Sequence, residues 1–109
     1  MVHDKYERGL EKCPANYTAL TPLYFLQRAA EIYPGKTAII YGDTQYDYRT
    51  YYDRCRKMAS ALKRRGIGKD DTVAMLAPNV PAVLEAHFGV PMCGAILNAM
   101  NTRLDAEVI

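Results

Sequence analysis

The sequence predicts an α/β fold in the order helix, β-hairpin, helix and then a parallel strand–helix–strand unit. Three observations predict it. Two β-prone runs flank Gly42-Asp43, and a two-residue turn that begins with glycine is typical of a tight hairpin. Amphipathic segments with defined ends lie on both sides of this hairpin. An apolar helix between two short apolar runs, over about 30 residues, is typical of the βαβ unit with parallel strands and a right-handed crossover.

Residues 1–18 carry mixed charge without a hydrophobic period, so we expect an N-terminal arm there and a partial domain over residues 19–109. The first helix should begin at Thr21, a favourable N-cap. Pro22 then takes the first helical position, where its missing N–H costs little. Pro34-Gly35 should end the helix. Its apolar half is expected to consist of Leu23, Phe25, Leu26, Ala29, Ala30, Ile32 and Tyr33.

The hairpin is expected over residues 37–41 and 44–48, with a type II′ turn and with Tyr46 and Tyr48 on one face. A second helix should follow over residues 50–65. Thr50 is its expected N-cap, and Gly66 lies just past its end. The apolar arc of this helix is expected to consist of Tyr51, Tyr52, Cys55, Met58, Ala59 and Leu62.

The second helix is strongly basic. Between Arg49 and Arg65 the chain has seven basic residues and one acid, Asp53, which gives a local charge of +6. Such a surface can meet an anionic cofactor, a membrane surface or an acidic partner. A solvated face opposite the core explains the same pattern without any function, and charge patterning favours that interpretation.

The βαβ unit begins with "TVAMLAP", a short apolar run that predicts a buried strand. Asn79 should cap a helix over residues 80–93, which Gly94 ends, and "AILNAM" should form the second strand. Glu85 is the only charged residue in this helix, which is otherwise apolar nearly all round. A helix of that kind needs cover on more than one side. One hairpin and two helices hardly provide it, so the sequence resembles the front end of a larger α/β body.

Polar residues follow both predicted parallel strands, at the edge where α/β proteins bind ligands. These candidates for lining a cleft are Asn79, Asn98, Asn101, Thr102 and Arg103. A structural role explains two of them more simply. Asn79 would cap its helix, and Thr102 with Asp105 has the spacing of a cap for a further helix.

His87 and the cysteines are weaker candidates. His87 lies two residues from Glu85, and residues two apart do not face each other on a helix, so a satisfied core histidine is the favoured interpretation. Cys13, Cys55 and Cys93 are odd in number and widely spaced. They indicate neither a disulfide framework nor a zinc site, and small buried side chains are expected.

Several classes of protein are disfavoured by composition and motif. A net charge of +2 in 109 residues is too small to indicate nucleic-acid binding. The polar N-terminus has no apolar segment typical of a signal peptide, and the longest apolar stretch contains Glu85, His87 and two prolines, which disfavours a membrane span. The sequence contains no Walker A, GxGxxG, HExxH or GxSxG motif.

The segment from Leu20 to Ile109 resembles the N-terminal part of the adenylate-forming, AMP-dependent synthetase family. The most specific stretch is "PNVPAVLEAHFGVPMCGAILNAMNTRL", and "YPGKTAIIYGDTQYDYRTYYDRCRKMASALKRRGIGKDDTVA" is similar to the preceding elements. Within the family the chain is most similar to acyl-CoA synthetases (fatty-acid–CoA ligases) and plant acyl-activating enzymes. The resemblance implies that the fold is the N-terminal part of the large domain of such an enzyme, and that it is incomplete.

The resemblance also implies an activity for the parent enzyme. ATP, with Mg²⁺, and a fatty or aromatic carboxylic acid give an acyl-adenylate, and CoA then displaces AMP to form a thioester. The family's phosphate loop, adenine and acyl pockets and C-terminal lysine have no counterpart before Ile109. We therefore expect no catalytic, cofactor-binding or metal-binding residue in this chain. The 109 residues alone should be inactive, poorly stable and unable to bind ATP, Mg²⁺ or CoA.

Two alternatives stay open at this point. One is a non-enzymatic α/β module whose basic helix binds an anionic partner. The other is an adenylating enzyme of the same superfamily that passes its acyl group to a carrier protein or oxidises it. The expected location is intracellular, in the cytoplasm, with the peroxisome as the alternative in a eukaryote. The expected partners are the acid, ATP, CoA and the remainder of the same polypeptide.

Overall fold

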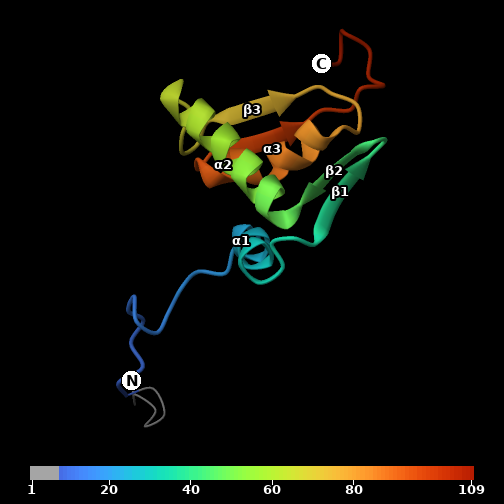
Figure 1. The fold of residues 1–109 in the computed structure, drawn as a ribbon. Coiled ribbons are helices and arrows are strands. Elements are labelled where there is room, and N and C mark those ends of the chain that lie inside the picture. The colour runs from blue at the N-terminus through green and yellow to red at the C-terminus, as the bar shows by residue number, and fades with distance from the viewer. Residues whose placement is uncertain (1–7) are drawn as a thin grey trace.

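The computed structural model describes residues 8–109 and contains the predicted elements in the predicted order (Figure 1). Positions 1–7 of the expected N-terminal arm lie outside the described residues. Within residues 8–18 the chain has turns and neither helix nor strand. The helices and strands are α1 (Leu23–Ile32), β1 (Thr37–Tyr41), β2 (Thr44–Asp47), α2 (Tyr48–Arg64), β3 (Thr72–Met75), α3 (Pro81–Met92) and β4 (Ile96–Ala99).

Helix α1 begins within one residue of the predicted position. Pro22 already has helical backbone angles, and Thr21 Oγ1 accepts a long hydrogen bond of 3.4 Å from the backbone N–H of Leu23. The apolar half is covered only in part. Leu26 and Ala30 are its buried members. Three other members of that half are exposed, namely Phe25, Ile32 and Tyr33.

The hairpin is antiparallel, as predicted, with a register irregularity between Thr37 and Ile39. Gly42 has a φ of +55°, and Asp43 does not have a positive φ. That combination is the type II′ pattern. The second strand ends at Asp47, one residue earlier than predicted, because Tyr48 is the first residue of α2. The expectation that Tyr48 shares a strand face with Tyr46 was therefore wrong.

Helix α2 begins before Thr50, and its N-cap is Asp47, whose Oδ1 accepts a 2.7 Å hydrogen bond from the backbone N–H of Thr50. The prediction that Thr50 is the cap was wrong. At the other end, Gly66 has a φ of +84°. The backbone N–H groups of Gly66 and Ile67 donate to the carbonyls of Lys63 and Leu62, which is the Schellman pattern.

Strands β3 and β4 pair in parallel, so the predicted βαβ unit is confirmed. Pro81 is the first residue of α3, and Val80, with extended backbone angles, takes the N-cap position. The expectation that Asn79 caps this helix was wrong. Gly94 ends the segment with a φ of +87°, and its backbone approaches Lys69.

The core lies around the contact between α2 and α3, which lie next to each other in Figure 1. One buried cluster joins α1, β1 and α2 through Leu26, Ile39, Tyr51 and Cys55. A second joins α3 to the parallel strands through Ala86, Val90 and Ala95.

Gly89 lies where α3 approaches α2 closely. A Cβ at this position would lie 3.0 Å from the carbonyl oxygen of Cys55 and 3.0 Å from Met58 Cβ. The two helices therefore approach through a glycine, and a side chain here would require the neighbouring atoms of α2 to shift.

Candidate functional site

A polar hollow of about 520 Å³ lies beyond the carboxyl ends of β3 and β4. It is lined by Ala77, Pro78, Asn79, Met100, Asn101, Thr102 and Arg103. The structure thus brings together four of the five polar residues that the sequence placed after the two strands. Asn98 is not among the lining residues, because it lies within β4.

The loop after β4 forms turns in place of the predicted helix. Thr102 therefore does not cap a helix with Asp105, and that expectation was wrong. Asn101 Oδ1 accepts a 3.0 Å hydrogen bond from the backbone N–H of Arg103, which holds the turn. Among the described residues the guanidinium of Arg103 has no carboxylate partner within ion-pair distance. The hollow is therefore polar and carries an available positive charge.

Glu85 and His87, two residues apart on α3, lie in different environments. Glu85 is buried and accepts hydrogen bonds from the guanidinium of Arg54, with Nε 2.5 Å from Oε1 and Nη2 3.4 Å from Oε2. This pairing, which spans 31 positions, was not predicted. His87 is exposed, and its Nδ1 lies 2.7 Å from the carbonyl oxygen of Val83. The prediction of a core histidine was wrong, because His87 lies at an open hollow between α3 and β1.

Two ionisable groups in the α2 core are held neutral. Burial, with a smaller contribution from the nearby Glu85, raises the pKa of the Cys55 thiol to about 12. Burial also raises the pKa of Tyr51, whose hydroxyl donates a 2.9 Å hydrogen bond to the carbonyl of Leu84. Neither group is poised to act as a nucleophile or a base near neutral pH.

The cysteines differ from one another. Cys55 is buried as predicted, and Cys93 is half-buried, with its thiol 3.1 Å from the carbonyl of Val90. Cys13 is exposed, which corrects the expectation that all three are buried. Across the described part of the chain, no three His, Cys, Asp or Glu residues gather in a way that could hold a metal ion. The described helices are all too short or too polar to span a membrane.

Comparison with known proteins gives a consistent family. The AMP-binding enzyme family matches residues 26–109. A peroxisomal acetate/butyrate–CoA ligase of Arabidopsis thaliana is 59% identical over 100 residues, which cover 92% of this chain and 18% of that protein. An acetate–CoA ligase of Humulus lupulus is 55% identical over 92% of this chain and 18% of its own length.

The fold comparison agrees with the sequence comparison. The crystal structure of a putative long-chain-fatty-acid CoA ligase from Rhodopseudomonas palustris superposes with a TM-score of 0.76 and 33% identity, over 81% of this chain and 22% of that one. The chain thus spans about a fifth of the length of these relatives, and the matched part is the N-terminal part of the large domain. The helix, hairpin, helix and βαβ unit predicted from the sequence are those of a known family, and the chain belongs to the AMP-binding enzymes.

Proposed function

We propose that the protein to which these residues belong is an AMP-forming acid–CoA ligase. The observation that carries the proposal is the 59% identity, over 92% of this chain, with a relative named as an acetate/butyrate–CoA ligase. Other relatives, 52% and 53% identical, are named as benzoate–CoA ligase and trans-cinnamate:CoA ligase. The supported substrate class is therefore a carboxylic acid, either short aliphatic or aromatic.

The proposed reaction has two steps. The acid's carboxylate oxygen attacks the α-phosphorus of ATP, which releases pyrophosphate and forms an acyl-adenylate. The thiol of CoA then attacks the acyl carbon, which releases AMP and forms the thioester. Such a reaction needs groups that clamp phosphates and stabilise developing charge. The described residues have neither a glycine-rich phosphate loop nor a cluster fit for Mg²⁺, so we assign no catalytic or metal-binding residue within them.

The contribution of this chain is mainly structural. The α2–α3 contact and the two parallel strands give a packed base, with residues 19–109 as the folded part and the residues before them as an arm. We further propose that the polar hollow faces the bound substrates, because ligands of α/β proteins bind beyond the carboxyl ends of parallel strands. Arg103 is the charged side chain there that suits an anionic substrate.

The experiment that tests the function uses the complete product of the reading frame that contains codons 1–109. The purified protein is mixed with ATP, Mg²⁺ and CoA and with acetate, butyrate, benzoate, cinnamate or a long-chain fatty acid. We expect acid-dependent release of pyrophosphate and formation of an acyl-CoA. Adenylate formation without any thioester would favour another adenylating enzyme of the superfamily. No acid-dependent pyrophosphate release would overturn the proposal.

Arg103 can be tested in the same protein. Arg103→Met should raise KM for ATP or CoA by about tenfold, because a lost charged hydrogen bond is worth about 1.5–3 kcal/mol. Arg28→Met, a matched loss of charge on the exposed side of α1, should leave both KM values unchanged. Unchanged KM values in Arg103→Met would show that the polar hollow does not contact the substrates. The proposed reaction would be unaffected by that result.

The cellular location is a separate proposal. Several relatives are named as peroxisomal proteins, which supports a peroxisomal location. A fluorescent protein fused to the N-terminus of the complete product should co-localise with a peroxisomal matrix marker. A diffuse cytoplasmic signal would support the cytoplasm instead.

A further inference from the structure

The outward face of α2 carries a narrow line of cations. At 3.6 residues per turn, seven exposed residues fall within about 120° of the helix circumference. They are Arg49, Asp53, Arg56, Lys57, Ser60, Lys63 and Arg64. We call this set the α2 stripe. It has five cations and one acid, and it runs for about 22 Å at 1.5 Å per residue.

Within the described residues, the cations of the α2 stripe form no ion pair. The one salt bridge within the described residues joins Arg54 to Glu85, and Arg54 is not part of the stripe. Asp53 forms no ion pair with Arg49 or Lys57 within the described residues. Two cation pairs, Arg56-Lys57 and Lys63-Arg64, repeat after seven residues, which places them on the same side of the helix two turns apart.

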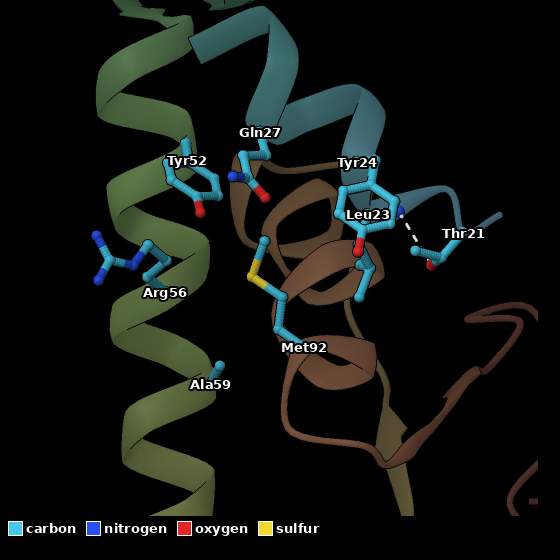
Figure 2. A pocket seen from close by; sticks show the side chains of 8 residues that line it. All are labelled: Thr21, Leu23, Tyr24, Gln27, Tyr52, Arg56, Ala59 and Met92. Carbon is cyan, nitrogen blue, oxygen red and sulfur yellow. Dashed lines mark hydrogen bonds between the residues drawn. The ribbon is translucent and has the colours of Figure 1, made fainter. Parts of the chain in front are cut away.

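A hollow of about 430 Å³ adjoins the stripe, between α1 and α2 (Figure 2). Tyr52 and Arg56 of α2 flank it on one side, and Tyr24 and Gln27 of α1 flank it on the other, with Met92 of α3 between them. We call it the α1–α2 hollow. Its complete lining is Thr21, Leu23, Tyr24, Gln27, Tyr52, Arg56, Ala59 and Met92.

Arg56 connects these two features. It lines the α1–α2 hollow and also a shallow depression of about 280 Å³ within the stripe, together with Asp53, Lys57 and Ser60. Its guanidinium lies 5.6 Å from the centre of the Tyr52 ring. A recess with both apolar and polar walls and a row of positive charges therefore form one continuous surface.

We propose that the α2 stripe and the α1–α2 hollow together dock an acidic, amphipathic segment of another protein. Its carboxylates would pair with the cations of the stripe, and one apolar side chain would enter the hollow. Helices that lie in a groove are recognised in this way, by an apolar anchor and a charged flank. A helix of about 15 residues matches the 22 Å length of the stripe.

The surface fits a protein better than a membrane or a nucleic acid. No large apolar side chain of α2 is strongly exposed, and Tyr24 is the one exposed large aromatic among the described residues that line the hollow, so the surface offers little to insert into a bilayer. Asp53 interrupts the row of cations, which opposes an evenly charged phosphate backbone. A protein partner can place a neutral or donor group opposite Asp53 and an apolar side chain in the hollow.

The test uses the complete reading-frame product and a fluorescent synthetic peptide of about 15 residues. The peptide is helical, with glutamates at seven-residue spacing on one face and a row of leucines along the adjacent face. A scrambled peptide of the same composition is the control. Binding is followed by fluorescence anisotropy at low and at physiological salt. We expect the patterned peptide to bind at least about tenfold more tightly than the scrambled one, because only the patterned peptide aligns both contacts.

Charge reversals then locate the site. The quadruple variant Arg56→Glu/Lys57→Glu/Lys63→Glu/Arg64→Glu should abolish binding and its salt dependence. Lys12→Glu/Lys69→Glu, on exposed positions outside the stripe, should retain both. Ala59→Gln, which fills the hollow without changing charge, should weaken binding several-fold and leave the salt dependence intact. Circular dichroism and thermal melts check that each variant is folded.

Three results would overturn the proposal. The first is equal binding of the patterned and scrambled peptides, and the second is unchanged binding in the quadruple variant. The third is tighter binding to vesicles of mixed phosphatidylcholine and phosphatidylserine, or to single-stranded DNA, than to the peptide. Each result is independent of ligase activity, which is assayed in parallel.

Discussion

Arg54 and Glu85 join α2 to α3 through an ion pair in which Arg54 Nε lies 2.5 Å from Glu85 Oε1. The two partners differ in exposure. The side chain of Glu85 is 5% exposed, whereas that of Arg54 is 44% exposed and also lies over the ring of Tyr46. The hydrogen bond to Glu85 raises the pKa of the Arg54 guanidinium. The carboxylate therefore depends on its partner for a counter-charge, while the guanidinium can reach water.

This asymmetry predicts unequal costs of mutation. Arg54→Met should lower the free energy of unfolding by about 2 kcal/mol, between the values for surface and buried pairs, because it leaves a buried carboxylate unpaired. Glu85→Gln should cost less, because it leaves a cation that solvent can hydrate. Urea denaturation of both variants and of the double variant checks the order. Equal costs would show that the pair is solvated at both ends.

A side chain at Gly89 should destabilise the fold. Gly89→Ala would place a Cβ 3.0 Å from the carbonyl of Cys55, so α2 and α3 must separate or shift. We expect a loss of about 1–3 kcal/mol in the free energy of unfolding, as for other overpacked cores. Gly68→Ala is the matched control, because a Cβ there meets no atom within 4 Å and Gly68 does not have a positive φ. A similar loss in both variants would contradict the close approach.

The capping role of Asp47 predicts that the stability of the fold depends on pH in the acidic range. The backbone N–H of Thr50 stabilises the carboxylate and holds the pKa of Asp47 below its ordinary value of 3.8. A lowered pKa in the folded state means that this stabilisation is present above the unfolded-state pKa. It is lost as the pH falls through the folded-state pKa. Asp47→Ala should therefore lower Tm near neutral pH and reduce the dependence of Tm on pH below about 4.

The matched control for Asp47 is Asp53→Asn. Asp53 lies in the second turn of α2 and is exposed. Among the described residues its side chain accepts no capping hydrogen bond. This variant should leave both Tm and its acidic pH dependence nearly unchanged. Thermal melts by circular dichroism between neutral and acidic pH make the comparison. A parallel decline in Asp47→Ala and wild type would exclude the cap as the cause.

The order of elements was predictable because each boundary has local chemistry. Gly42-Asp43 specifies the tight turn, Gly66 ends α2, and the strand–helix–strand length specifies the parallel unit. The cap of α2 was misplaced because Asp47 and Thr50 are both good caps. The tertiary pairing of the hairpin, which ends at Asp47, decides between them.

The polar hollow was predictable for a topological reason, since residues after parallel strands meet at one edge of the sheet. The burial of single residues on α3 was not. A helix that is apolar all round has no periodic signal that tells which side faces a neighbour, so His87 was expected inside and is exposed. The Arg54–Glu85 pair was missed because its partners are 31 positions apart and neither has a distinctive local motif.

The different exposure of the cysteines predicts different rates of reaction with a thiol reagent. A thiol reagent should modify Cys13 rapidly in the native protein, because this side chain is exposed. Cys55 should react only as fast as the chain unfolds, since it is fully buried and its pKa of about 12 leaves almost no thiolate at neutral pH. Mass spectrometry of digested, labelled protein assigns each site, and Cys13→Ser should remove the rapid phase. Rapid labelling of Cys55 in that variant would show that the α2–α3 contact opens readily, contrary to the packing around Gly89.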